Sequence, residues 1–219
     1  MAFTQETYDF LSDLSHNNSK AWFDDNRSRY EYHWLEPAKD FVIDWNSFMD
    51  GLSPVHKCSP KVNGSIRRIN RDVRFSKDKT PYSPKIHLVF WCGDHPNRSP
   101  AIHVVVHPDR LGMGVGQWAM TADELAAFRS GVADNERGAQ LSKLVEDLKA
   151  EGLTLASESL KRLPSGVPEG SGRDTFFKRK GLVLTTGDNS MPLSMLKDRA
   201  GLERIFTKMA RIDRWLMAG

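Results

Sequence analysis

The stretch KIHLVFWCGDHPNRSPAIHVVVHPDRLGMGVGQWAM, residues 85–120, decides the fold. It contains runs rich in β-branched, aromatic and glycine residues, separated by clusters of glycine, proline, aspartate and asparagine. Such runs are typical of β-strands, and the clusters between them are typical of turns. The runs that predict strands are 85–91, 101–107 and 110–120.

Two further segments of the chain have an extended pattern. Residues 66–76 predict a strand that pairs with 85–91 across the proline-containing loop KDKTPYSP, and 182–186 predict a last strand. Amphipathic helices are predicted on both sides of the strand block, with apolar residues spaced by three and four. The segments that carry these helices are 4–14, 20–30, 37–52, 121–128, 136–150 and 201–217.

Helices followed by strands and then by helices predict an α+β fold, because a doubly wound fold would alternate them regularly. We expect a central antiparallel or mixed sheet covered by N-terminal, middle and C-terminal helices. The sequence has no repeat, low-complexity tract or clear linker, so a single domain over residues 1–219 is the simplest organisation.

Composition is that of an ordinary soluble protein, with 39% hydrophobic and 27% charged residues. No apolar run approaches the roughly 20 residues that span a bilayer. The first ten residues lack the basic region of a secretory signal. We therefore expect a cytoplasmic protein without a membrane partner, in which Cys58 and Cys92 are free buried thiols.

Positive charge is concentrated in RRINRDVRFSKDKTPY, residues 67–82. From Arg67 to Lys85, seven cationic side chains stand against two aspartates, a local charge of +5. The whole chain carries +3, so the remainder sums to −2. One positive field in a near-neutral chain predicts a surface that attracts anions.

Strand alternation divides the arginines of this segment between two faces. Arg71 falls on the same face as Ile69 and Phe75, so we expect it to be buried. A buried guanidinium needs a partner, which predicts a structural ion pair with Asp24, Asp25 or Asp72. A ligand-binding role for Arg71 is the alternative.

On the opposite face, Arg68 and Arg74 are expected to grip an anion together with Lys77 and Lys79 from the following loop. The hydroxyl of Tyr82 is expected to contribute a hydrogen bond to the same ligand. Asp72 is the best available acid–base catalytic group. The competing interpretation is a solvated basic edge strand, whose lysines prevent pairing between sheets.

The other candidate residues predict no metal site and leave open whether the protein binds a cofactor. His87, His103 and His107 share a face of neighbouring predicted strands, but no carboxylate pattern or HxH pair accompanies them, so ordinary sheet histidines are favoured over a metal site. The glycines of GMGVG lack dinucleotide-binding spacing, and we expect them to let an aromatic ring or another backbone approach the sheet. Trp22, Phe23 and Trp118 are expected in the core.

Four segments resemble a known family. They are NNSKAWFDDNRSRY at 17–30, RINRDVRFSKDKTPYSPK at 68–85, GMGVGQW at 112–118 and LPSGVP at 163–168. Together, and in this order, they are similar to the family known as domain of unknown function 2461. The resemblance implies a soluble α+β domain and assigns no catalytic residue.

Three functions remain open on the sequence. The first is binding of a small phosphate- or carboxylate-bearing ligand, with or without catalysis, through the basic strand and loop. The second is a nucleic-acid-binding module in which Phe75, Tyr82 or Trp91 stacks on bases. The third is a structural or protein-interaction domain in which the arginines pair with internal carboxylates.

Overall fold

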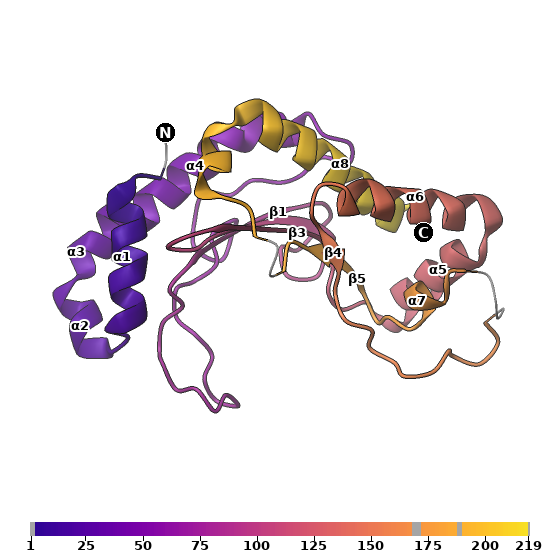
Figure 1. Ribbon diagram of the computed structural model, residues 1–219, viewed down its shortest axis with the longest axis horizontal. Coiled ribbons are helices and arrows are strands. Elements are labelled where there is room, and N and C mark those ends of the chain that lie inside the picture. Colours follow the sequence, from indigo (N-terminus) through magenta and orange to yellow (C-terminus); the bar gives the residue numbers. More distant parts are fainter. Residues whose placement is uncertain (1–2, 168–171, 188–189, 219) are drawn as a thin grey trace.

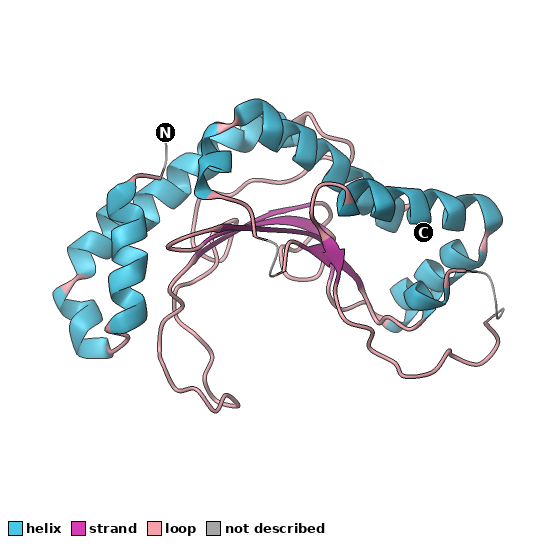
Figure 2. Cartoon of the chain, in the orientation of Figure 1, coloured by secondary structure: helices cyan, strands magenta, loops and turns pink. Residues whose placement is uncertain are grey.

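The computed structural model describes residues 3–167, 172–187 and 190–218. Figure 1 shows a curved sheet with the long helices α4 and α8 lying over one of its faces. Figure 2 shows that no helix of the described residues crosses the opposite face, although helices flank it on both sides. One face of the sheet is therefore packed against helices and the other is open.

The described residues form one five-stranded sheet with the order β1-β2-β3-β5-β4, and every neighbouring pair is antiparallel. The strands are β1 Ile86–Trp91, β2 Ala101–Val106, β3 Leu111–Gln117, β4 Thr154–Leu155 and β5 Leu182–Thr185. Four of them lie where the sequence predicts strands, and the short β4 was not predicted. An antiparallel sheet with separate helical segments confirms the α+β class.

Helices precede, interrupt and follow the strands, as predicted. They are α1 Gln5–His16, α2 Lys20–Asp25, α3 Arg27–Tyr30, the π-helical Glu31–Leu35, α4 Glu36–Asp50, α5 Ala122–Ala133, α6 Asn135–Lys149, α7 Asp174–Phe177, the 3-10 helix Leu193–Lys197 and α8 Arg199–Met217. Among the described residues, no helix is both long and apolar enough to cross a membrane.

The core lies between the sheet and helices α4 and α8. Every second residue of each long strand faces it, as Ile86, Leu88 and Phe90 do on β1, and these side chains are fully buried. Trp45 of α4 and Phe206 of α8 meet edge to face, with ring centroids 4.8 Å apart. This face supplies the main apolar burial of the protein. Of the alternate residues, Val89, Trp91 and Ala101 form a second, small buried cluster, and others, such as His87, remain available for other roles.

The strand predicted at 66–76 is not formed. Its first half makes only isolated bridges, Ile66 with Leu88 and Asn70 with Tyr82. Beyond them, an oxygen of Asp72 accepts the backbone N–H of Arg74 at 3.3 Å. Such side-chain hydrogen bonds to the local backbone compete with a strand ladder. Phe75, expected on a buried face, is 95% exposed.

Candidate functional site

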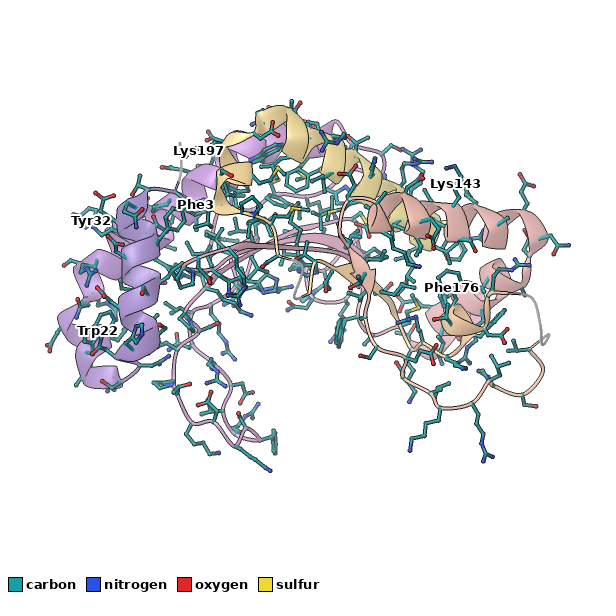
Figure 3. The ribbon with its side chains drawn as sticks, viewed as in Figure 1. Phe3, Trp22, Tyr32, Lys143, Phe176 and Lys197 are labelled. Carbon is teal, nitrogen blue, oxygen red and sulfur yellow. The ribbon has the colours of Figure 1, made fainter. Side chains whose placement is uncertain are left out.

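The open face of the sheet carries a hollow of about 400 Å³. Figure 3 shows side chains with nitrogen atoms projecting from this face, away from α8. The hollow is built by strand alternation, because the residues between the buried positions must point to the side without helices. The residues that line it are Lys85, His87, His103, Val105, His107, Gly112, Met113, Gly114, Gly116, Trp118, Val183, Thr185, Thr186 and Gly187.

Glycines of β3 form the floor of the hollow. Gly112 pairs with Val105, and Gly114 pairs with His103 on one side and Thr185 on the other. Gly116 has a φ of +118°, and a Cβ atom there would collide with the carbonyl oxygen of Leu182 on β5. The predicted close approach of another backbone is thus confirmed at Gly116. Without side chains, the rest of this floor is flat and low.

Two histidines meet at one end of the floor. Nε2 of His87 lies 2.9 Å from Nδ1 of His103, so one imidazole donates a hydrogen bond to the other. Burial, followed by repulsion from a protonated His103 and from the cations Arg67 and Lys85, lowers the pKa of His87 to about 3. Burial and then Arg67 lower the pKa of His103 to about 4. Both rings are therefore neutral at physiological pH.

Cationic side chains surround these neutral rings. Burial, and then Arg110 and Lys85, lower the pKa of His107 to about 4. Arg67 is half-buried, and its guanidinium donates to the carbonyl oxygen of Pro96 at 2.8 Å and to the side chain of Asn97. Neither partner carries a charge. Among the described residues, neither Arg67 nor Lys85 forms an ion pair, so their positive potential over the hollow is not neutralised.

Trp118 stands at the edge of the hollow with 74% of its surface exposed. The expectation that it belongs to the core is wrong. Gln117, its predecessor, is buried, and alternation turns the next side chain to the opposite, open side. Of the two other aromatics expected in the core, Phe23 is buried and Trp22 is partly buried against the core.

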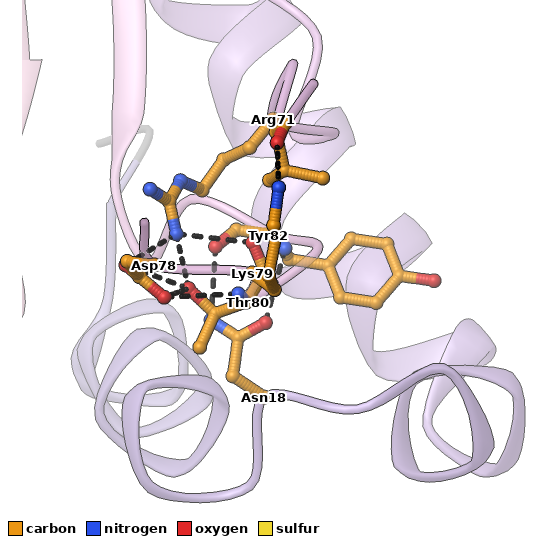
Figure 4. Close-up of polar contacts among 7 residues, drawn as sticks. Asn18, Arg71, Asp78, Lys79, Thr80 and Tyr82 are labelled. Carbon is orange, nitrogen blue, oxygen red and sulfur yellow. Dashed lines mark hydrogen bonds and ion pairs between the residues drawn. The ribbon is translucent and has the colours of Figure 1, made fainter. Parts of the chain in front are cut away.

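Residues 67–82, here called the basic arm, extend beyond the sheet on the side of the open face (Figure 1). Within the arm, the Arg71 guanidinium lies 2.6 Å from a carboxylate oxygen of Asp78 and donates to the carbonyl oxygen of Thr80 at 3.0 Å (Figure 4). Neither Asp24, Asp25 nor Asp72 is its partner. Arg71 therefore closes the tip of the arm and does not join the sheet to the helix at 20–30.

The remaining charges of the arm are arranged locally. Arg74 pairs with Asp72 at 2.7 Å, and this hydrogen bond is the main reason that the pKa of Asp72 is lowered. Lys79 donates to the carbonyl oxygen of Val73 at 2.9 Å. Arg68 and Lys77 are exposed and form no ion pair within the described part of the chain.

Tyr82 anchors the base of the arm. Its ring is 6% exposed and stacks on Phe23 of α2, with centroids 4.1 Å apart. The side chain of Asn18 accepts the backbone N–H of Tyr82 at 3.0 Å and donates to its carbonyl oxygen at 2.9 Å. These contacts fasten the arm to the N-terminal helices.

The structure thus separates two groups of residues. None of the residues predicted from the arm lines the hollow: Arg68, Arg74, Lys77, Lys79, Tyr82 and the catalytic candidate Asp72 all lie outside its lining. Lys85 and the three histidines line it instead. A signal for them was available in the sequence, because histidines and glycines alternate with buried apolar residues on adjacent strands.

The comparison with known families supports the resemblance drawn from the motifs. Residues 6–215 match the family model described as "Conserved hypothetical protein (DUF2461)", which confirms that resemblance. The segment LPSGVP belongs to the matched region, although its last residue, Pro168, lies outside the described residues. No curated protein matches the sequence.

Proposed function

The chain belongs to the DUF2461 family of conserved hypothetical proteins, and from the geometry of its open sheet face we propose that it binds a small organic anion there. The observation that carries this proposal is a hollow with a glycine floor, beside the cationic side chains of Arg67 and Lys85, which form no ion pair among the described residues. Ligand sites are typically concave and mostly apolar, with a few polar groups that orient the ligand.

The two ends of the hollow suit different parts of a ligand. Gly112 and Gly114 offer a flat surface, and the exposed ring of Trp118 offers a face for stacking, so this region favours a planar or apolar body. Lys85 offers an ammonium group near His87, and its charge favours a carboxylate or phosphate. The ligand class is therefore an anion attached to a flat organic group.

The histidines favour an anion over a metal cation. The charges of Arg67 and Lys85 already lower the pKa of His87, and the same charges would repel a divalent cation placed between His87 and His103. An anion in the hollow is instead attracted by these charges.

Binding is better supported than proton transfer. A general base works best with a pKa near the working pH, whereas burial holds the pKa of His87 at about 3 and that of His103 at about 4. Asp72 is ion-paired with Arg74 on the arm and does not line the hollow. We therefore assign no catalytic step to these residues.

The test is calorimetric titration with inorganic phosphate, aromatic carboxylates, aryl phosphates and the matching neutral amides. We expect binding of the aromatic anions but not of the amides. Lys85→Met should weaken binding by about 10- to 100-fold, since a hydrogen bond to a charged group contributes about 1.5–3 kcal/mol. Lys77→Met removes the same charge from the tip of the arm and is the matched control. Equal losses in both variants, or no binding by any anion, would contradict the proposal.

A second candidate function is binding of single-stranded nucleic acid by the basic arm. Phe75 favours it, because an aromatic ring that is 95% exposed beside cationic side chains suits base stacking. The guanidinium of Arg74 lies 5.8 Å from the ring centroid of Phe75. A gel-shift titration with a short oligonucleotide at low salt tests this candidate, and absence of a shift would exclude it.

A further inference from the structure

Three buried side chains with metal-binding atoms meet on the helix-covered side of the protein. His56 follows α4 in the chain, Cys92 follows β1, and Asp213 lies on α8. All three are buried, with exposed fractions of 1%, 0% and 0%. Their ligand atoms, one from each residue, all lie within 4.8 Å of one another. The hollow proposed to bind an anion contains none of them.

The contacts of His56 match those of a metal ligand. Its Nδ1 lies 2.8 Å from the carbonyl oxygen of Pro54. A carbonyl only accepts, so Nδ1 carries a proton, and Nε2, which faces Asp213, is the ring nitrogen that can coordinate a metal. Metal-binding histidines commonly donate their second ring N–H to a backbone carbonyl in this way, which fixes the tautomer and the orientation of the ring.

Asp213 has a carboxylate oxygen without a hydrogen-bond partner. Its Oδ2 lies 2.9 Å from Nε2 of His56. Its Oδ1 is fully buried and has no hydrogen-bond partner among the described residues. An unsatisfied carboxylate oxygen in the interior is costly, and each such atom calls for a specific explanation.

We propose that His56, Cys92 and Asp213 form a binding site for one divalent transition metal ion, with Zn²⁺ as the best fit. A mixed set of imidazole, thiolate and carboxylate ligands suits Zn²⁺, whereas Mg²⁺ and Ca²⁺ prefer oxygen ligands alone. In tetrahedral coordination the nitrogen and oxygen ligands stand roughly 3.3 Å apart. The 2.9 Å between His56 and Asp213 therefore needs to open only slightly.

Charge balance favours the site. Without metal, the Cys92 thiol is neutral. One proton lies between Nε2 of His56 and the carboxylate of Asp213, and with this proton the pair has no net charge. With metal, the dication replaces that proton and the thiol proton, and both leave to solvent. The thiolate, the carboxylate and the dication again sum to zero, so metal binding places no net charge in the interior.

A cysteine protease-like arrangement does not fit the same residues. A nucleophilic cysteine needs a histidine within hydrogen-bond reach. Here both ring nitrogens of His56 are engaged, by Pro54 and Asp213. The Cys92 thiol contacts the carbonyl oxygen of Pro100 at 3.2 Å instead, and burial raises its pKa.

All three side chains are buried, but Cys92 borders a second hollow of about 440 Å³, which Pro100, Gln117, Met120 and Phe128 also line. This hollow lies on the Cys92 side of the cluster and offers a route for the metal. Zinc sites with three protein ligands take a water molecule as the fourth ligand.

The experiment uses the full chain. The protein is unfolded in urea with a chelator, dialysed to remove the urea and the chelator, and refolded in the presence of Co²⁺ or Zn²⁺. Refolding with the metal present ensures that burial of the site cannot prevent the metal from binding. We expect one metal per chain by elemental analysis and a thiolate-to-cobalt charge-transfer band in the near ultraviolet. Calorimetry in buffers of different ionisation enthalpy should detect about two protons released per metal at pH 7. Zn²⁺ should raise the melting temperature.

Cys92→Ser should lose the cobalt band, whereas Cys58→Ser should keep it. Cys58 is a matched control because it is the only other cysteine, and its sulfur lies 3.9 Å from the backbone oxygen of His56 without joining the ligand cluster. The wild-type measurement needs no variant to fold. Refolded wild type without stoichiometric metal, or a cobalt spectrum without the thiolate band, would overturn the proposal. So would a band that persists in Cys92→Ser.

Discussion

Nε2 of His87 and Nδ1 of His103 lie 2.9 Å apart on adjacent strands of the open sheet face. The two rings share one hydrogen bond and face positive charge rather than carboxylates. Protonation of either imidazole is therefore unfavourable in the folded protein. This should make the stability of the fold depend on pH.

The stability of the protein should fall as the pH decreases from about 6.5 towards 4. In the unfolded chain histidine takes up a proton near pH 6.5, whereas burial lowers the pKa of His87 to about 3 and that of His103 to about 4 in the fold. The unfolded state thus binds more protons in this window, and folding loses about 1–2 kcal/mol per histidine between pH 7 and pH 5. Urea unfolding at the two pH values measures the loss.

His103→Gln should reduce this pH dependence, because the replaced side chain does not titrate. Asn46→Gln, on the exposed surface of α4, is the control, because it replaces no titratable group and should leave the slope unchanged. If wild type and His103→Gln lose the same stability between pH 7 and pH 5, the assignment to the histidine pair is wrong.

Ligand binding should show the opposite trend with pH. An anion beside the imidazoles raises their pKa values, so the complex binds more protons than the free protein. We expect affinity for an aromatic anion to increase roughly three- to tenfold from pH 7.5 to pH 5.5. Titration calorimetry at both values tests this, with His107→Gln expected to flatten the dependence. Affinity that is independent of pH would argue against binding beside the histidines.

Two glycines of β3 should respond differently to alanine. A Cβ atom at Gly112 would make ordinary contacts, at 3.4 Å or more, with Val105 and His107. Gly112→Ala should therefore fold normally and weaken ligand binding by filling the floor of the hollow. At Gly116 the positive φ and the carbonyl of Leu182 forbid a side chain, so Gly116→Ala should cost more than about 2 kcal/mol. Thermal unfolding and calorimetry on both variants distinguish these effects.

The anchor of the arm should depend on Asn18. Asn18→Ala removes both hydrogen bonds to the backbone of Tyr82, and we expect a loss of about 1–3 kcal/mol. Trypsin should then cut the basic arm faster than in wild type, since a released arm exposes its arginines and lysines. Asn46→Ala, on the exposed surface of α4, is the control. Unchanged proteolysis would mean that the stacking of Tyr82 on Phe23 holds the arm alone.

Phe75 should contribute nothing measurable to folding. Its side chain is 95% exposed, so Phe75→Ala should change stability by less than about 0.5 kcal/mol. If the arm binds single-stranded nucleic acid, the same substitution should weaken that binding by about 1–3 kcal/mol, the usual contribution of a stacked base. An affinity that does not change would remove the specific support for this second function.

Much of the fold follows from short-range pattern. Helical spacing of apolar residues marks α1, α4, α6 and α8, and runs of β-branched residues mark β1 and β2, because burial of one face imposes a period on each element. The strand at 66–76 fails for a related reason. Its charges and its side-chain hydrogen bonds to the backbone favour turns. Its tip has no apolar face that would be buried if it paired with the sheet.

The sequence by itself determined which residues alternate on each strand, and so which side chains share a face. Only the tertiary structure decided which face the helices cover, and this places Trp118 outside the core and Lys85 in a hollow. The tertiary structure also decided that Arg71 pairs with Asp78, because the fold of the loop brings these two side chains together. His56 and Asp213 are 157 positions apart and carry no spacing motif. Their contact exists because α8 packs across the sheet, and local sequence pattern does not encode which distant elements pack together.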